Sequence, residues 1–176
     1  MQFLNFQDMY RAIQVNRRKL PKSIDLIVGI PRSGLLPATM LSTQLNLPLT
    51  DVEGLKAGKV FGHGVTKKTP DIDKALSSDR NVLVIDDCVG SGRAFREARK
   101  ALEGLCGNIY YCAVFSLLDP HPDVDFVLES RDSLYLHPWN FMHSEVLENA
   151  CVDMDGVLCR NPEKHEDDDG QAYRKF

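Results

Sequence analysis

The sequence predicts a doubly wound α/β protein with a mostly parallel sheet and a small irregular hood over the carboxyl edge of that sheet. Three short runs, residues 24–30, 82–85 and 109–118, are almost continuously apolar, which is typical of parallel strands buried on both faces. The first two lead through a tight glycine-bearing turn into segments of helical composition, residues 35–45 and 93–102. This order is that of the βα unit, and such sheets bind ligands at the carboxyl ends of their strands.

The remaining elements follow from local patterns. Residues 6–19 predict an amphipathic first helix that ends before Pro21, because apolar side chains recur there at helical spacing. Residues 47–52 and 124–128 predict further short strands. Residues 54–80 contain glycines and lysines without apolar periodicity, so they are expected to form either a mobile basic flap or a plain solvated loop. The apolar positions of the first helix are Phe6, Met9, Tyr10, Ile13 and Val15.

Composition limits the classes of function. The 176 residues have room for one ordinary domain, expected over residues 1–146, with part of a second over residues 147–176. The formal net charge of −4 argues against a nucleic-acid partner. No signal-peptide layout and no apolar run of membrane-spanning length is present, so we expect a cytoplasmic protein without a membrane partner.

The central motif is NVLVIDDCVGSGRAF, residues 81–95. We expect Asp86 and Asp87 to end the strand, so that both carboxylates lie at the ligand-binding edge. Backbone N–H groups and the positive end of the following helix converge after them, which predicts a phosphate site. Cys88 is either a thiol of lowered pKa near a helix N-terminus or a small residue that fills the turn. The residues of this phosphate site are Cys88, Val89, Gly90, Ser91, Gly92 and Arg93.

A second motif of the same kind lies upstream, in VGIPRSG. Its loop consists of Pro31, Arg32, Ser33 and Gly34, placed between a predicted strand and a predicted helix. Arg32 stands at the tip, where it is either an anion ligand or an ordinary surface residue. Two phosphate-type turns in one chain favour the ligand.

Together the two motifs resemble those of the type I phosphoribosyltransferases, a likeness that covers about residues 20 to 142. The resemblance implies that Asp86 and Asp87 face the ribose hydroxyls of phosphoribosyl pyrophosphate (PRPP), and that the turn at residues 88–93 holds its 5′-phosphate. It also implies that the loop at residues 31–34 holds the pyrophosphate, often with a non-proline cis peptide, which would be Pro31–Arg32 here.

The resemblance implies an activity as well. A homodimeric, Mg²⁺-dependent enzyme would transfer ribose 5-phosphate from PRPP to a nucleobase-like acceptor and release pyrophosphate. The catalytic residues would be Asp86, Asp87, Arg32 and a flap lysine, Lys67 or Lys68, with Mg²⁺ held by the aspartates directly or through water. The alternative is a regulatory protein of this fold that senses PRPP without turnover.

The hood is expected at residues 134–142, LYLHPWNFM. It resembles a region of purine-type members that ends in Pro-Trp, which implies that Tyr135 stacks on the base and that the Leu136 backbone meets its edge. Two departures leave the acceptor open. Gly90 and Pro120 stand where hypoxanthine-guanine transferases carry an acidic residue and a lysine, and neither can supply that chemistry.

The last segment contains VDMDGVL, in which Asp153 and Asp155 resemble the first motif of the haloacid-dehalogenase-like (HAD-like) phosphatases. That resemblance implies a nucleophilic Asp153 and an acid–base Asp155. Too few residues follow to complete that fold, so we expect a truncated domain of a longer, bifunctional protein. The alternative is an acidic tail in which the motif is coincidental.

Overall fold

The computed structural model describes residues 2–62, 70–105 and 107–141. The chain divides into two compact units, Met1–Trp139 and Asn140–Phe176, and the fold below is that of the first. Lys67, Lys68, Asp153 and Asp155 lie outside the described residues, as does the expected domain boundary after residue 146. Predictions about those residues therefore stay predictions.

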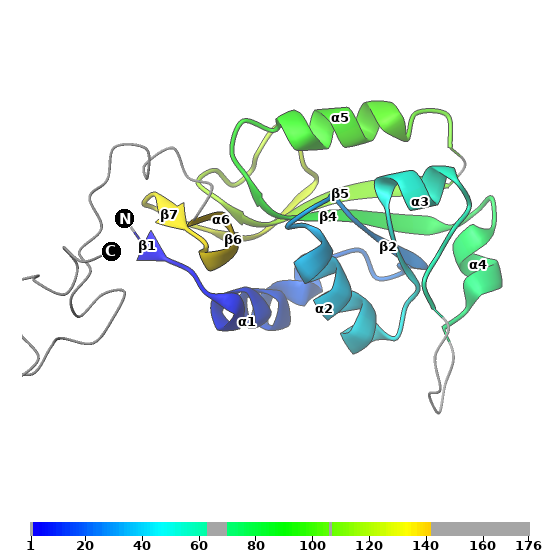
Figure 1. Ribbon diagram of the computed structural model, residues 1–176, viewed down its shortest axis with the longest axis horizontal. Coiled ribbons are helices and arrows are strands. Elements are labelled where there is room, and N and C mark those ends of the chain that lie inside the picture. The colour runs from blue at the N-terminus through cyan, green and yellow to red at the C-terminus, as the bar shows by residue number, and fades with distance from the viewer. Residues whose placement is uncertain (1, 63–69, 106, 142–176) are drawn as a thin grey trace, which may run out of the picture. The chain divides into compact units, whose positions relative to one another are not determined.

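The first unit is built on a five-stranded parallel sheet in the order β3-β2-β4-β5-β6 (Figure 1). This arrangement confirms the predicted doubly wound, mostly parallel sheet. The chain moves outward from β2 to β3 and then returns to place β4 on the other side of β2. The switch point, where such sheets bind ligands, therefore lies between β2 and β4. The strands are β2 (Leu26–Gly29), β3 (Leu49–Asp51), β4 (Asn81–Val89), β5 (Asn108–Ser116) and β6 (Phe126–Ser130).

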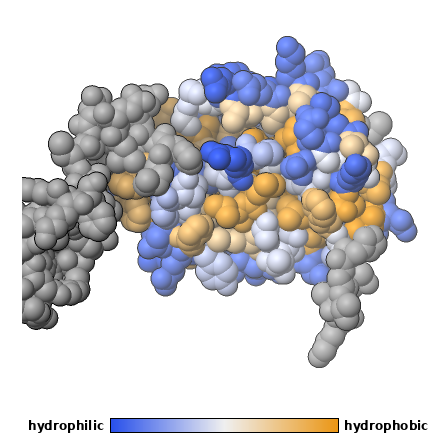
Figure 2. All heavy atoms as spheres, in the orientation of Figure 1, coloured by the Kyte–Doolittle hydropathy of each residue, from blue (hydrophilic) through white to orange (hydrophobic). Residues whose placement is uncertain are grey.

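Helices cover both faces of the sheet (Figure 1). On one face α1 (Phe6–Asn16) and α2 (Leu35–Leu45) pack on a core that includes Ile27, Leu83 and Phe115. The other core holds side chains from α3 (Val52–Lys56), α4 (Ile72–Leu76) and α5 (Arg93–Ala101). The outward side of α5 is hydrophilic (Figure 2), because only its Phe95 and Ala98 are buried.

The first helix differs in part from its prediction. A capping box between Asn5 and Asp8 starts α1, and the helix ends at Asn16, followed by a 3₁₀ turn (Arg17–Lys19). Met9 and Ile13 are buried as their spacing predicts. The other three predicted face positions are about half-exposed or more, because the five residues cover more than the width of one helix face: Phe6, Tyr10 and Val15.

The flap prediction is wrong for two segments of residues 54–80. Helix α3 extends through Lys56 and buries Leu55, and α4 (Ile72–Leu76) buries Ala75. Helices of five residues show no periodicity because each buries only one or two side chains. Residues 63–69 lie outside the described part of the chain.

The hood forms where the two ends of the unit meet. Strand β1 (Gln2–Phe3) pairs in parallel with β7 (Tyr135–Leu136), and α6 (Pro138–Phe141) follows. The Leu4 N–H extends this pairing by donating to the Leu136 carbonyl at 2.9 Å. Among the described helices, none has the length and apolar character required to cross a membrane.

Candidate active site

Strand β4 carries the acidic pair, but it does not end there. It continues to Val89, and Cys88 and Val89 pair with Phe115 and Ser116 of β5. The prediction that Asp86 and Asp87 end the strand is therefore wrong, because backbone pairing with a long neighbour does not depend on side-chain polarity. Both aspartates are buried, and the Asp87 N–H donates to Asp86 Oδ1 at 2.8 Å.

Asp87 joins three separate segments of the chain. Its Oδ1 accepts a hydrogen bond from Ser33 Oγ at 3.0 Å, and its Oδ2 accepts one from Trp139 Nε1 at 2.6 Å. The Cys88 N–H donates to Oδ1 as well, at 3.0 Å. These bonds connect the loop at residues 31–34, hereafter the arginine loop, with β4 and with α6.

The arginine loop approaches β4 closely at Gly34. A Cβ atom on Gly34 would lie 2.4 Å from the Ile30 carbonyl oxygen and 2.8 Å from Asp86 Oδ1, so only glycine fits there. The expected cis peptide at Pro31–Arg32 is present, and the Arg32 side chain is exposed to solvent at the edge of the sheet. The structure thus brings the two predicted motifs together at the switch point.

Burial gives Asp86 unusual electrostatics. Burial is the main cause that raises the pKa of its carboxyl group; the neighbouring charge of Asp87 and a side-chain hydrogen bond with it raise the pKa further, while the bond from the Asp87 N–H lowers it in part. Asp86 therefore retains a proton far above the usual range. A cation or a set of hydrogen-bond donors that reached the pair would stabilise the ionised form.

Cys88 is not a thiol of lowered pKa. It lies on β4 rather than at the start of α5, and burial together with the charges of Asp87 and Asp86 raises the pKa of its thiol. The hypothesis of an activated cysteine is therefore wrong. The alternative, a small residue between strand and turn, agrees with its half-buried position.

The turn at residues 90–92, hereafter the glycine turn, has the backbone shape that its sequence predicts. Gly92 has a φ of 72° and precedes α5, and the Ser91 hydroxyl accepts a hydrogen bond from the Arg93 N–H at 3.5 Å. A Cβ atom on Gly92 would lie 1.8 Å from Asp123 Oδ2, whereas one on Gly90 would meet nothing within 4 Å. Gly90 and Ser91 are exposed beside the positive end of α5, where an anion is favoured.

Sequence reasoning missed the residues that hold this turn. His121 Nε2 donates to the Gly90 carbonyl at 3.1 Å, and its Nδ1 accepts from the Asp123 N–H at 3.2 Å. Asp123 also pairs with Arg96 of α5 at 2.5 Å. No short motif signals these contacts, since His121 lies 31 positions from Gly90.

Of the predicted base-binding residues, Tyr135 lies in an aromatic cluster and Leu136 pairs with Phe3 of β1. The half-buried Tyr135 ring packs against Phe115 at 6.0 Å and His137 at 5.3 Å between ring centroids. His137 stacks on Trp139 at 4.5 Å with an angle of 8° between the rings. His137 and Trp139 were not among the predicted site residues, although LYLHPWNFM places both beside Pro138.

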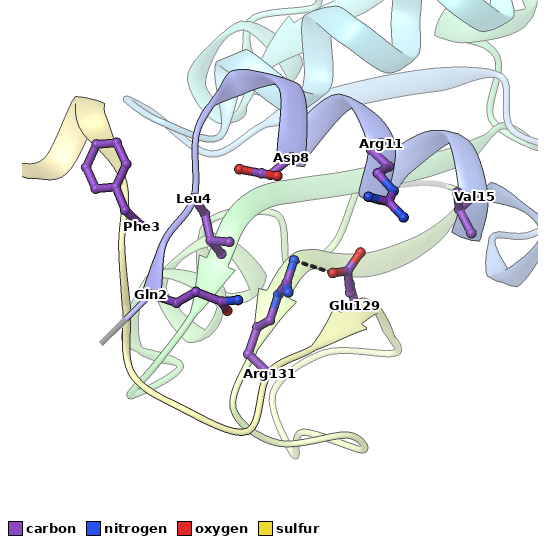
Figure 3. A pocket seen from close by; sticks show the side chains of 8 residues that line it. All are labelled: Gln2, Phe3, Leu4, Asp8, Arg11, Val15, Glu129 and Arg131. Carbon is purple, nitrogen blue, oxygen red and sulfur yellow. Dashed lines mark ion pairs between the residues drawn. The ribbon is translucent and has the colours of Figure 1, made fainter.

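A cavity of about 400 Å³ lies elsewhere, between β1, α1 and the end of β6 (Figure 3). Arg131 forms an ion pair with Glu129 there. This cavity contains none of the predicted site residues. The candidate site lies instead at the arginine loop and the glycine turn, whose residues have the chemistry for binding phosphate. The lining residues of the cavity are Gln2, Phe3, Leu4, Asp8, Arg11, Val15, Glu129 and Arg131.

An acidic pair between two phosphate-type loops, at the switch point of a parallel sheet, defines a class of α/β protein that binds phosphorylated ligands at that point. Comparison with known families agrees with this class. The sequence model of the phosphoribosyl transferase domain matches residues 5–116. The chain belongs to the phosphoribosyltransferase family.

Curated relatives carry two kinds of name. A xanthine-guanine phosphoribosyltransferase of Idiomarina loihiensis is 26% identical over 153 residues, which are 83% of this chain and 90% of the relative. An orotate phosphoribosyltransferase of Oceanobacillus iheyensis is 37% identical over 134 residues, 76% of this chain and 56% of the relative. The chain thus spans little more than half the length of this orotate relative. Both names confirm the predicted transferase at the level of the family.

Solved structures confirm the fold. A purine phosphoribosyltransferase of Pyrococcus horikoshii superposes with a TM-score of 0.54 at 21% identity, over 78% of this chain and 92% of that chain. A xanthine-guanine-hypoxanthine phosphoribosyltransferase of Helicobacter pylori superposes with a TM-score of 0.53 at 12% identity, over 84% and 97%. The family match ends at residue 116, so the roles expected for Tyr135 and Leu136, and for Asp153 and Asp155, rest on resemblance alone.

Proposed function

We propose that this protein transfers the ribose 5-phosphate group of PRPP to a nucleobase-like acceptor and releases pyrophosphate. The observation that carries the proposal is the contact between the two motifs. Ser33 Oγ donates to Asp87 Oδ1 at 3.0 Å, while Gly34 lies so close to Asp86 that no Cβ would fit. Pyrophosphate and ribose would therefore be bound side by side, as cleavage of the bond between them requires.

Each segment then has one role. The glycine turn, with Cys88 and Val89 before it and Arg93 after it, would hold the 5′-phosphate at the start of α5. The exposed Arg32 would bind the pyrophosphate, and the rest of the arginine loop would supply backbone contacts. Asp86 and Asp87 would meet the ribose hydroxyls.

Mg²⁺ fits the chemistry of this site. Two adjacent carboxylates, one of which has a raised pKa because of its burial and the neighbouring charge, form an oxygen-rich site for a hard cation. When bound through Asp86 and Asp87, directly or through water, Mg²⁺ would neutralise charge on the pyrophosphate. Lys67 or Lys68 would add positive charge from the flap.

The residues of this chain would act by positioning and by charge. As the bond to pyrophosphate breaks, positive charge develops on the ribose, and the carboxylates of Asp86 and Asp87 would stabilise it. Arg32 would stabilise the negative charge of the leaving group. Asp86 would release its proton when substrate and cation arrive, so binding at neutral pH should liberate a proton.

The test is a scan for pyrophosphate release with PRPP, Mg²⁺ and each of orotate, xanthine, guanine, hypoxanthine and adenine. One acceptor should support turnover, and Asp87→Asn should slow it strongly with little change in melting temperature. Binding of PRPP by calorimetry without turnover on any acceptor would instead favour the sensor. Failure to bind PRPP would refute both readings.

The scan should include a Gly90→Asp variant. The space beside Gly90 is open, so a carboxylate fits without disturbing the turn. If the acceptor is a purine, the variant should turn it over faster, because it restores an acid at the position where hypoxanthine-guanine transferases carry one. The homodimer implied by the resemblance is tested separately by sedimentation.

A further inference from the structure

Three potential metal ligands of different chemistry meet at the candidate active site. Ligand atoms of Asp87, Cys88 and His137 all lie within 4.8 Å of one another. Two come from the end of β4 and the third comes from the hood, after β7. The set combines a carboxylate oxygen, a thiol sulfur and an imidazole nitrogen.

His137 is prepared to act as a ligand. Its Nδ1 lies 3.2 Å from the Leu4 carbonyl oxygen, which can only accept, so Nδ1 carries the proton and Nε2 presents a lone pair. The residue is only 2% exposed, and Nε2 has no hydrogen-bond partner in the described part of the chain. A histidine held by a carbonyl through one nitrogen, with the other free, is the usual arrangement at a metal. Burial also lowers the pKa of His137, which keeps the imidazole neutral.

The surrounding contacts fix the three ligands relative to one another. The His137 ring stacks on Trp139, and Trp139 Nε1 donates to Asp87 Oδ2 at 2.6 Å. A carboxylate oxygen has two lone pairs, so Oδ2 keeps one after this bond. Cys88 follows Asp87 directly in a paired strand, which limits the freedom of its side chain.

We propose that Asp87, Cys88 and His137 form a binding site for a thiophilic divalent cation, of which Zn²⁺ is the one to test. Sulfur and imidazole donors select Zn²⁺ over Mg²⁺, which prefers oxygen alone. Three protein ligands leave a fourth position for water. Binding would form a bond from the Cys88 sulfur to the metal and release the thiol proton to solvent.

The metal site shares Asp87 and Cys88 with the proposed active site, so metal binding has a consequence for activity. A cation held by Asp87 would oppose contact of that carboxylate with ribose. Zn²⁺ should therefore inhibit turnover in competition with PRPP, and Cys88→Ser should relieve the inhibition. This consequence rests on the proposed function, whereas binding of the metal does not.

Binding is tested on the full chain without substrate, with Co²⁺ as a spectroscopic probe and Zn²⁺ as its competitor. The wild type should show a thiolate-to-cobalt charge-transfer band that Zn²⁺ abolishes. Cys88→Ser, which keeps the size of the side chain, and His137→Gln should lose the band and bind Zn²⁺ at least about tenfold more weakly. Cys112→Ala is the matched control, because this buried cysteine lies on β5 outside the cluster and the band should persist.

Two results would overturn the proposal: absence of the band in the wild type, or an unchanged band and Zn²⁺ affinity in Cys88→Ser. Circular dichroism checks the fold of His137→Gln, and if that variant unfolds, Cys88→Ser alone decides. A wild-type protein that shows no cobalt band but releases pyrophosphate normally would refute the metal site and leave the transferase intact. A wild-type protein that shows the cobalt band but releases no pyrophosphate would refute only the transferase.

Discussion

Replacing Asp86 by asparagine should stabilise the folded protein at neutral pH while it weakens PRPP binding. The pKa of Asp86 is raised in the folded state, chiefly by burial, whereas an unfolded aspartate titrates near 3.9. Above pH 4 the folded state therefore holds a proton that the unfolded state has lost. The free energy of unfolding must fall as the pH rises through this window. Asparagine carries no such penalty.

The size of the effect follows from linkage. Each pH unit within the window lowers the free energy of unfolding by about 1.4 kcal/mol, which gives an upper limit of about 4 kcal/mol between pH 4 and pH 7. Relaxation and water penetration reduce it, so we expect a gain of about 2–4 kcal/mol at pH 7. The asparagine side-chain oxygen can still accept the 2.8 Å bond from the Asp87 N–H, so the shape of the site is kept.

The assay is urea denaturation at pH 4, 5.5 and 7, with the wild type, Asp86→Asn and Asp132→Asn. Asp132 is exposed, so its variant makes the same change of charge without relief of burial. The difference between Asp86→Asn and the wild type should grow with pH, and that of the control should stay small. A difference that does not change with pH, or an Asp86→Asn protein that is less stable at pH 7, would show that Asp86 is ionised in the folded state.

Three further changes test the loops and the hood. Gly92→Val should cost about 1–3 kcal/mol of stability and abolish binding of the 5′-phosphate, because Gly92 has a φ of 72° and its Cβ would overlap Asp123. The control is Gly90→Ala, which places its Cβ in open space and should have neither effect. Calorimetry compares the two variants. Trp139→Phe removes the 2.6 Å bond to Asp87 and should destabilise the protein by about 1.5–3 kcal/mol in thermal melts; an unchanged melting temperature would contradict that contact. Ser33→Ala should raise the KM for PRPP clearly while the melting temperature changes little, since the arginine loop loses its bond to the acidic pair. A KM equal to that of the wild type would refute this coupling.

The features that the sequence predicts correctly are local. Runs such as residues 82–85 identify buried strands because every side chain in them is apolar, and Ser33-Gly34 and Ser91-Gly92 identify turns because glycine permits shapes that other residues do not. The switch-point location follows from the order of these units along the chain. Fold and loop positions therefore required no knowledge of distant contacts.

The features that were missed depend on partners far away in sequence. The extension of β4 to Val89 needs β5 beside it, and the raised pKa of the Cys88 thiol needs the burial that this pairing brings. His121 holds the glycine turn through a contact across 31 positions. Strand β1 (Gln2–Phe3) has only two residues, too few for any pattern.

The pairing of β1 with β7 also governs the order in which the protein assembles on the ribosome. Leu4 and His137, which hydrogen-bond in the finished hood, are separated by 133 positions. At a synthesis rate of about 5–20 residues per second, β7 is synthesised on the order of ten seconds after β1. The sheet from β2 to β5 can form during that interval, so the acidic pair is in place before the hood closes over it. Within the first unit, closure of the hood then follows formation of the sheet, and the early peptide must stay unpaired until closure occurs.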